Sequence, residues 1–325
     1  MSEKGVLEES MDAPIFLLLA GFVVLGFAGE ALLRGAVTIA ARLNVSPLII
    51  GLTIIAFGTS APELTVSLNA VLNGQPDIAI GNVVGSNIAN ILLVLGMMAA
   101  ISPFALEDST LTRDGGFMLG VSFMLVALGF YGLISLPIGA FMLLILIGFT
   151  VYLYTSARSD ADTAEAEAGV DENQVPGGLT VAVPVLLVGI AGVIWGADLT
   201  VNGALGLARQ FGISEAVIAL SLVAIGTSLP ELAVSMVAAM RGHAALAVGN
   251  IIGSNISNIL LILGATAVIA PLPVSAAMAM RDVPIMAGVA CLGLLFMVSG
   301  RRMSRHEGIL CLALYAAYMG FIFSA

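Results

Sequence analysis

The chain consists of two copies of one sequence unit, and this duplication constrains its fold more than any other feature. Residues 52–96 align with residues 220–264 without a gap. Each copy carries the same two motifs, Gly-Thr-Ser-x-Pro-Glu at 58–63 and 226–231 and Gly-Ser-Asn-Ile-x-Asn at 85–90 and 253–258. The sequence therefore predicts two structurally related halves.

The apolar content of both copies predicts a membrane protein. Hydrophobic residues make up 59% of the 325 residues, charged residues make up 10%, and the mean hydropathy is +1.10. Soluble domains are about one quarter charged, so lipid must be the solvent for much of this chain. The apolar runs do not alternate as barrel strands do, which predicts an all-α membrane protein. Ten transmembrane helices are expected, at 13–41, 46–72, 78–101, 115–133, 136–155, 179–208, 214–240, 245–270, 283–299 and 307–324.

The number of spans determines how the two copies are related. Each copy has five expected spans, and because five is odd, the second copy enters the membrane from the opposite side. Inverted repeats of this kind are typical of secondary transporters. The distribution of Arg and Lys between alternate loops places both termini outside and predicts a multi-pass protein of the cell (inner) membrane. The inside loops contain Arg42, Arg113, Arg158, Arg241, Arg301, Arg302 and Arg305, and the outside ends contain Lys4, Arg209 and Arg281.

A polar segment separates the two copies. We expect a first repeat at 1–155, an acidic cytoplasmic linker at 156–178 and a second repeat at 179–325. The linker is rich in Ala, Glu and Asp, a composition typical of solvated, flexible segments.

The first motif places a proline and a carboxylate inside an apolar span. Pro62 has no amide hydrogen, and its ring clashes with the carbonyl of Gly58, so we expect a broken helix there. Carbonyls freed by the break need partners where water is absent. Glu63 at mid-membrane costs at least about 2.5–3.5 kcal/mol. Pro230 and Glu231 repeat this arrangement in the second copy.

The polar residues around the two glutamates form a set of oxygen ligands. Thr59 and Glu63 are four residues apart and share a helix face, as are Ser86 and Asn90. Carboxylate, hydroxyl, amide and carbonyl oxygens suit hard cations such as Ca²⁺ and Na⁺, whereas zinc or copper favours His or Cys. The alternative is that Ser, Thr and Asn only join helices by hydrogen bonds. Four glycines beside these residues would permit close helix approach, namely Gly81, Gly85, Gly249 and Gly253.

The paired motifs closely resemble the alpha repeats of the calcium/cation antiporter superfamily, in particular those of prokaryotic sodium/calcium exchangers. The resemblance covers nearly the whole chain. It implies a divalent site made by Glu63 and Glu231 with the main-chain carbonyls of Thr59 and Thr227. Sodium sites would share both glutamates. They would add Ser60, Ser86, Ser228, Ser254 and the carbonyls of Ala56 and Ala224, and Asn90 and Asn258 would complete the centre.

The resemblance also implies the activity. Because Na⁺ and Ca²⁺ would compete for the same carboxylates, the expected function is antiport of Na⁺ against Ca²⁺ by alternating access, with electrogenic Ca²⁺ extrusion. The first and sixth spans would move as a pair against the other eight. Relatives that require potassium carry aspartate at the positions of Asn90 or Asn258, so the two asparagines argue against a potassium requirement.

Other interpretations stay open from the sequence. An antiporter of the same fold could exchange H⁺ for Ca²⁺ or carry Mg²⁺ or Mn²⁺. A remote alternative is an intramembrane hydrolase with Glu63 and Glu231 as acid and base. We expect a transporter rather than an enzyme, with lipid, Ca²⁺ and Na⁺ as partners, and no cofactor, nucleic acid or obligatory protein partner. Glu30 and Asp198, near the ends of the first and sixth spans, could serve ion entry or interfacial anchoring.

Overall fold

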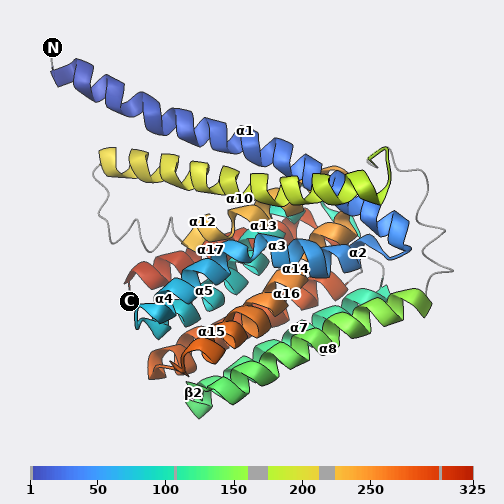
Figure 1. The fold of residues 1–325 in the computed structure, drawn as a ribbon. Helices are drawn as coiled ribbons and strands as arrows, with labels where there is room; N and C mark the ends of the chain where they lie inside the picture. Colours follow the sequence, from blue (N-terminus) through green and yellow to red (C-terminus); the bar gives the residue numbers. More distant parts are fainter. Residues whose placement is uncertain (1–2, 106–107, 160–174, 212–223, 300–301, 325) are drawn as a thin grey trace.

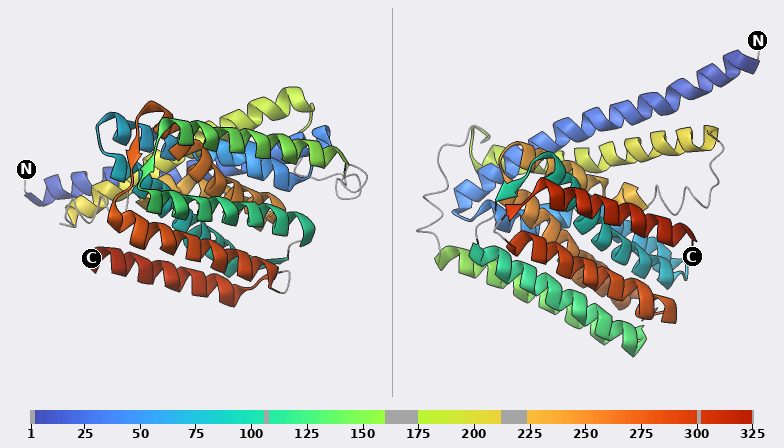
Figure 2. Two further views of the ribbon diagram at one scale, coloured as in Figure 1. Left: turned by 90° about the horizontal axis from the view of Figure 1, so that it is seen from below. Right: turned by 180° about the vertical axis from the view of Figure 1, so that it is seen from behind.

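The computed structural model describes residues 3–105, 108–159, 175–211, 224–299 and 302–324, which form a bundle of helices (Figure 1). Two long helices, α1 (Glu3–Leu43) and α10 (Leu179–Gln210), lie side by side along one flank of the bundle (Figure 2). The remaining helices of the first half are α2 (Pro47–Ile50), η1 (Gly51–Ile55), α3 (Ala56–Thr59), α4 (Ala61–Leu72), α5 (Pro76–Ala89), η2 (Asn90–Leu95), α6 (Gly96–Ile101), α7 (Asp108–Tyr131) and α8 (Leu136–Ser159), where η marks a π-helix. Those of the second half are α12 (Ala224–Thr227), α13 (Leu229–Met240), α14 (Ala244–Ser257), η4 (Asn258–Leu263), α15 (Gly264–Ile269), η5 (Met278–Asp282), α16 (Val283–Val298) and α17 (Arg305–Ser324).

The described residues include seven helices that are long and apolar enough to cross a membrane, or eight if the bent helix pair Pro47–Thr59 and Ala61–Leu72 is one span. This confirms an all-helical membrane protein. The seven are Ala13–Leu43, Pro76–Ile101, Thr112–Tyr131, Leu136–Ser156, Leu179–Gln210, Ala244–Ile269 and Met278–Val298. Of the other expected spans, 214–240 falls partly outside the described residues, and 307–324 coincides with α17. The total of ten therefore stays a prediction.

Both expected helix breaks are present. In the first half α3 ends at Thr59, Ser60 leaves the helical region with φ −80° and ψ 5°, and Pro62 stands in the first turn of α4. The two segments meet at a bend of 44°. Ser228, with φ −88° and ψ 3°, takes the same position before α13. Proline is tolerated in a first turn because the amide groups there have no intrahelical partner, so each Pro ends one helix and begins the next.

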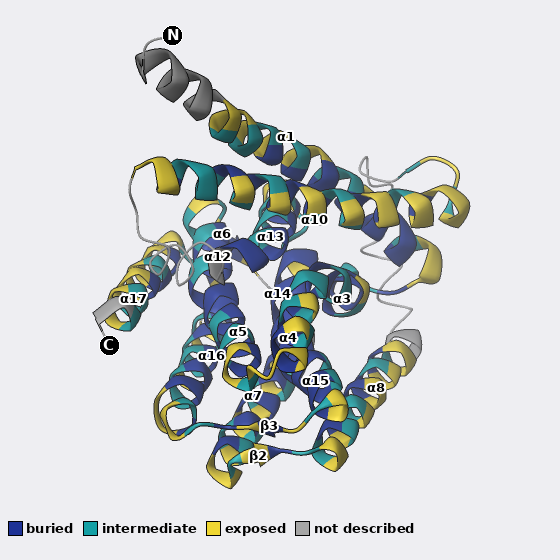
Figure 3. Cartoon of the chain, turned by 60° about the vertical axis from the view of Figure 1, so that its left-hand side comes forward, coloured by how far each residue is buried: buried dark blue, intermediate teal, exposed yellow. Residues whose placement is uncertain are grey.

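Helices α5 and α14 lie in the interior, whereas α1, α10 and α8 expose much of their surface (Figure 3). A Cβ built on Gly249 or Gly253 of α14 would overlap the carbonyl oxygens of Leu48 and Leu52. The close approach expected at these two glycines is therefore confirmed. In the other half, a Cβ on Gly81 would lie 3.2 Å from the methyl of Met278, and one on Gly85 meets no described atom within 4 Å.

Glycines also allow α1 and α10 to approach each other closely. A Cβ on Gly35 would lie 2.7 Å from the amide nitrogen of Leu186, and one on Gly189 would lie 2.5 Å from that of Leu32. Positions early in α1 face positions late in α10, so the two helices are antiparallel. Small residues allow this backbone-to-backbone packing in membranes, where hydrophobic association between helices is weak.

Two short β-strand pairs connect the halves, and they are related to each other by the repeat. The short strand β1 (Phe104–Ala105) pairs with β4 (Arg302–Met303), and β2 (Leu133–Ile134) pairs with β3 (Leu272–Pro273). The shift of 168 residues that aligns the two copies carries β1 onto β3, and it carries β2 onto β4 to within one residue, so one pairing becomes the other. Helix α7 runs from β1 to β2, which places the two small sheets at opposite ends of that helix.

Candidate cation-binding centre

Glu63 and Glu231 occupy equivalent places in the two broken helices. Each stands in the first turn after the break, in α4 and in α13, and each is only 1% exposed. The amino-terminal end of a helix carries unpaired amide groups and a partial positive charge, which stabilises a nearby carboxylate. Two acidic side chains are thus held inside the protein at helix ends that favour their charged form.

The threonine of each first motif lies beside the glutamate of the other half. Ser60 Oγ donates to Glu231 Oε1 over 3.4 Å, and Thr59 also lies beside Glu231. Thr227 lies beside Glu63. The carboxylate of Glu63 is close enough to that of Glu231 for the two to repel each other. Helix α13, which carries Glu231, packs against α3, which ends at Thr59. Residues of both copies therefore make one centre.

Many buried polar atoms at this centre have no hydrogen-bond partner among the described residues. Such an atom ordinarily costs about 1–3 kcal/mol, so a cluster of them needs an explanation. A cation would satisfy the oxygens together, with about six to eight needed for Ca²⁺. The buried atoms without a described partner are the two carboxylate oxygens of Glu63, Oε2 of Glu231, the hydroxyls of Ser86, Ser228, Ser254 and Ser257, the two side-chain amide atoms of Asn90, and Oδ1 of Asn258.

All ten predicted side chains from Thr59 to Asn258 are buried, and Thr59, Ser60 and Thr227 lie beside the two glutamates. Ser257 is an addition that the motif pattern did not indicate. The predicted side chains are Glu, Ser, Thr and Asn, so the donor set is one of oxygens. That chemistry fits Ca²⁺ and Na⁺ as substrates.

Of the four expected carbonyl ligands, that of Ala56 already accepts a hydrogen bond within the chain. The carbonyl of Ala56 accepts the amide of Ser60 at 3.1 Å and the hydroxyl of Thr59 at 3.4 Å. One acceptor position is therefore used by the Ser60 amide, and the other faces Thr59, whose single hydroxyl proton can go instead to Oδ1 of Asn250. The carbonyl that loses its helical partner to Pro62 is that of Gly58. Ala224 begins α12, directly after the undescribed residues 212–223.

Two asparagines attach the broken helices to their neighbours. Asn82 Nδ2 donates to Ser67 Oγ at 3.0 Å and to the main-chain oxygen of Glu63 at 3.1 Å. The equivalent Asn250 donates to Ser235 Oγ at 3.1 Å, and its Oδ1 accepts the hydroxyl of Thr59 at 3.3 Å. These bonds connect helices on both sides of the centre and hold its ligands in position.

Replacing Ser235 by alanine is expected to lower the free energy of unfolding by about 1–3 kcal/mol, because Asn250 then keeps a buried amide group without its partner. The thermal unfolding midpoint in detergent measures the change. Ser122→Ala is the matched control, since this buried hydroxyl donates only to the carbonyl of Met118 in its own helix. Equal shifts for the two variants would contradict the role given to Ser235.

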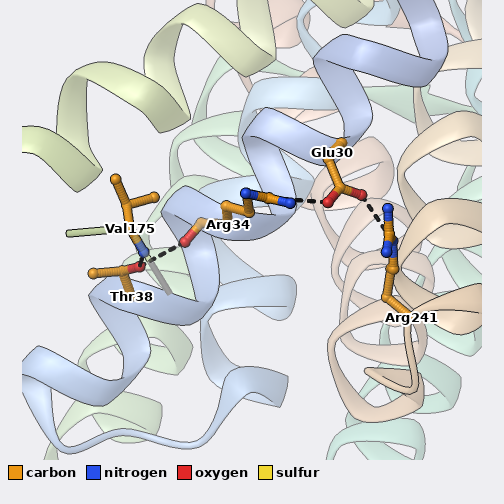
Figure 4. A network of polar contacts seen from close by, with 5 residues as sticks. All are labelled: Glu30, Arg34, Thr38, Val175 and Arg241. Atoms are coloured by element: carbon orange, nitrogen blue, oxygen red, sulfur yellow. Dashed lines mark hydrogen bonds and ion pairs between the residues drawn. The ribbon is translucent and has the colours of Figure 1, made fainter. Parts of the chain in front are cut away.

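Glu30 lies outside the centre and joins α1 to the end of α13 (Figure 4). Its carboxylate accepts Arg34 Nε at 2.9 Å and Arg241 Nε at 2.9 Å. One turn beyond Arg34, Thr38 Oγ1 accepts the amide of Val175 at 2.7 Å, which attaches the segment before α10 to this helix. Glu30 therefore anchors α1 to the second half.

Comparisons with known proteins agree with this chemistry. The family model described as "Sodium/calcium exchanger protein" matches residues 13–155 and 181–324. The putative antiporter CaxA of Alkalimonas amylolytica is 39% identical over 96% of this chain and 99% of its own length. The sodium/calcium exchanger MaX1 of Methanosarcina acetivorans is 33% identical, over 94% of this chain and 97% of its own.

The fold is also that of a solved exchanger. The structure of the sodium-calcium exchanger NCX_Mj soaked with zero Na⁺ and Ca²⁺ superposes with a TM-score of 0.82 at 32% identity, covering 96% of this chain and 99% of that one. These relatives are exchangers and antiporters rather than enzymes, which rejects the hydrolase alternative. By its family match, its relatives and its fold, the chain belongs to the sodium/calcium exchanger family.

Proposed function

We propose that this protein exchanges Na⁺ for Ca²⁺ across the cell (inner) membrane and extrudes Ca²⁺ electrogenically. The observation that carries this proposal is the pair of buried carboxylates, Glu63 and Glu231, surrounded by oxygens from both halves that have no described partner. Two carboxylates balance one Ca²⁺, and the same carboxylates can instead hold Na⁺. Competition for shared ligands makes the release of one ion a condition for binding the other.

The proposed ligands are those indicated by the paired motifs. Glu63 and Glu231 serve both ions, with Thr59 and Thr227 at the divalent site. The hydroxyl ligands are Ser60, Ser86, Ser228 and Ser254, and Asn90 and Asn258 complete the centre. Ala56 and Ala224 would contribute carbonyls; for Ala56 this requires the hydroxyl of Thr59 to turn away.

The proposed topology is ten transmembrane helices in two inverted repeats, 1–155 and 179–325, joined by a cytoplasmic linker at 156–178, with both termini outside. The exchange of the β1–β4 and β2–β3 pairings between the halves supports it, because each small sheet lies at a different end of α7. The family match to 13–155 and 181–324 separates the chain at the same place.

Alternating access would come from α1 and α10 moving together against the remaining helices. Their shared backbone contact supports movement as a pair. A Cβ on Gly58 would lie 2.7 Å from Ile190 of α10, and one on Gly226 would lie 2.5 Å from Val201 of the same helix. Because α10 contacts the glycine that begins each first motif, its movement would reach both helix breaks.

Proteoliposomes that contain Na⁺ and are diluted into Na⁺-free buffer with ⁴⁵Ca²⁺ are expected to accumulate calcium. A pH gradient of either direction without Na⁺ should drive none. If a pH gradient but not a Na⁺ gradient drove uptake, the protein would be an H⁺/Ca²⁺ antiporter instead. Competition by unlabelled Mg²⁺ or Mn²⁺ tests the other divalent candidates.

The electrogenic part has its own measurement. If more than two Na⁺ leave for each Ca²⁺ that enters, positive charge moves outward. An inside-positive potential should then speed uptake, since one charge gains about 2.3 kcal/mol per 100 mV. Uptake that ignores the potential would indicate electroneutral exchange.

A further inference from the structure

Asn87 is the third residue of the second motif, and neither its sequence position nor the proposed ligand set gives it a role. It is buried in α5, at 4% exposure, beside the start of η4. Its Oδ1 accepts a hydrogen bond from Nδ2 of Asn258 over 3.0 Å. Its own Nδ2 donates to the main-chain oxygen of Asn255 over 3.3 Å and lies 3.6 Å from the sulfur of Met286. Asn87 thus connects a proposed ligand of the second half to the backbone of that half.

This chain of bonds determines which way both amides face. A main-chain carbonyl can only accept, so Asn87 must present its NH₂ group to Asn255 and its oxygen to Asn258. An amide oxygen can only accept as well, so Asn258 must present its NH₂ group to Asn87. The oxygen of Asn258 is consequently turned to the opposite side.

The oxygen of Asn258 is one of the buried polar atoms that have no hydrogen-bond partner among the described residues. Ser254, four residues earlier and on the same helix face, also has an unpaired hydroxyl. The hydrogen bonds from Asn258 through Asn87 to Asn255 therefore leave a buried amide oxygen available to a cation.

The equivalent hydrogen bond, from Asn90 to Asn255, does not form. Asn255, which aligns with Asn87, donates its Nδ2 to the carbonyl of Ile251 in its own helix at 3.0 Å. Asn90, which aligns with Asn258, has both amide atoms without a partner in the described part of the chain. The two halves therefore differ at this pair of residues although their motifs are equivalent.

We propose that Asn87 is a positioning residue that keeps the amide oxygen of Asn258 directed at the bound cation. Asn258 is then a permanent oxygen ligand, whereas the amide of Asn90 is free to turn. This makes the centre functionally asymmetric. The inference rests on the proposed function, because it assumes that a cation binds between Glu63 and Glu231.

The experiment measures Ca²⁺ binding alone, in Na⁺-free buffer, by isothermal titration calorimetry of the full chain in detergent. Asn87→Ala should raise the dissociation constant about tenfold, which is the lower end for loss of a residue that orients a ligand. Asn258→Ala should raise it at least as much. The variant with both changes should bind no more weakly than Asn258→Ala, because Asn87 acts only through Asn258. Asn255→Ala, the mirror control, should bind as the wild type does.

Each other outcome has a definite meaning. The positioning role is overturned if Asn87→Ala leaves the dissociation constant unchanged. It is also overturned if that change weakens Ca²⁺ binding by the same factor in the Asn258→Ala background as in the wild type. Should Asn87→Ala not fold, Asn87→Leu keeps the volume, removes the acceptor, and is held to the same expectations. If the wild type itself binds no Ca²⁺, the proposed function fails. If the wild type binds Ca²⁺ and Asn87→Ala binds it equally well, only the role of Asn87 fails.

Discussion

Replacing Glu63 or Glu231 by glutamine is expected to abolish Na⁺-driven Ca²⁺ uptake into proteoliposomes. Glutamine keeps the volume of the side chain and one oxygen but removes the charge. Ca²⁺ would then face a single carboxylate in a buried site where its hydration cannot be replaced. Changes in residues that only support a ligand cost about 10–100-fold in metal affinity, so loss of a ligand charge should reduce uptake by more than about 100-fold.

The matched control is Asp77→Asn, which makes the same chemical change in an exposed acid at the start of α5. It should transport as the wild type does. Because each half supplies one carboxylate, the two glutamine variants should fail alike. Full activity in either variant, with normal folding, would place the cation site elsewhere.

Replacing Gly253 by valine is expected to lower the unfolding midpoint and remove most transport activity. The new Cβ would overlap the carbonyl of Leu52, a main-chain atom that cannot turn aside as a side chain can. Overpacking of this kind costs about 1–3 kcal/mol. Relief requires η1 to move away from α14, which displaces Thr59 at one side of the centre and Ser254 at the other. A shift of about 1 Å in a positioned group can cost about 100-fold in rate.

Uptake and thermal unfolding of the same preparation separate the two effects. Gly148→Val is the control, because Gly148 is exposed on α8 and a Cβ there meets no described atom within 4 Å. It should leave both measurements near the wild-type values. A Gly253→Val protein with a wild-type midpoint and full uptake would show that α14 and η1 are not held as closely as their backbones indicate.

Much of this centre could be predicted from local chemistry. The helix breaks follow from Pro62 and Pro230, because a missing amide hydrogen and a ring clash act within one turn of the chain. The buried carboxylates follow from their place in apolar runs. Asn82 and Asn250 occupy equivalent positions in the two copies and make equivalent bonds, to Ser67 and to Ser235. These properties depend on residues close in sequence, or on equivalent residues in two aligned copies.

The rest depended on contacts between residues that are not equivalent. The alignment pairs Thr59 with Thr227, but in space Thr59 lies beside Glu231 and Thr227 beside Glu63. Nor could the sequence indicate that Glu30 pairs with Arg241, since the aligned residue of Arg241 is Asn73.

The sequence by itself thus determined the chemical nature of the centre: two carboxylates, hydroxyls and amides placed at helix breaks in a membrane protein of two related halves. Only the tertiary structure decided how those groups are oriented. In that structure the amide of Ser60 bonds to the carbonyl of Ala56, and Asn87 orients the amide of Asn258, whereas Asn90 has no partner among the described residues. The physical reason is that a hydrogen bond orients an amide according to whichever donor or acceptor lies opposite, and that neighbour comes from another helix.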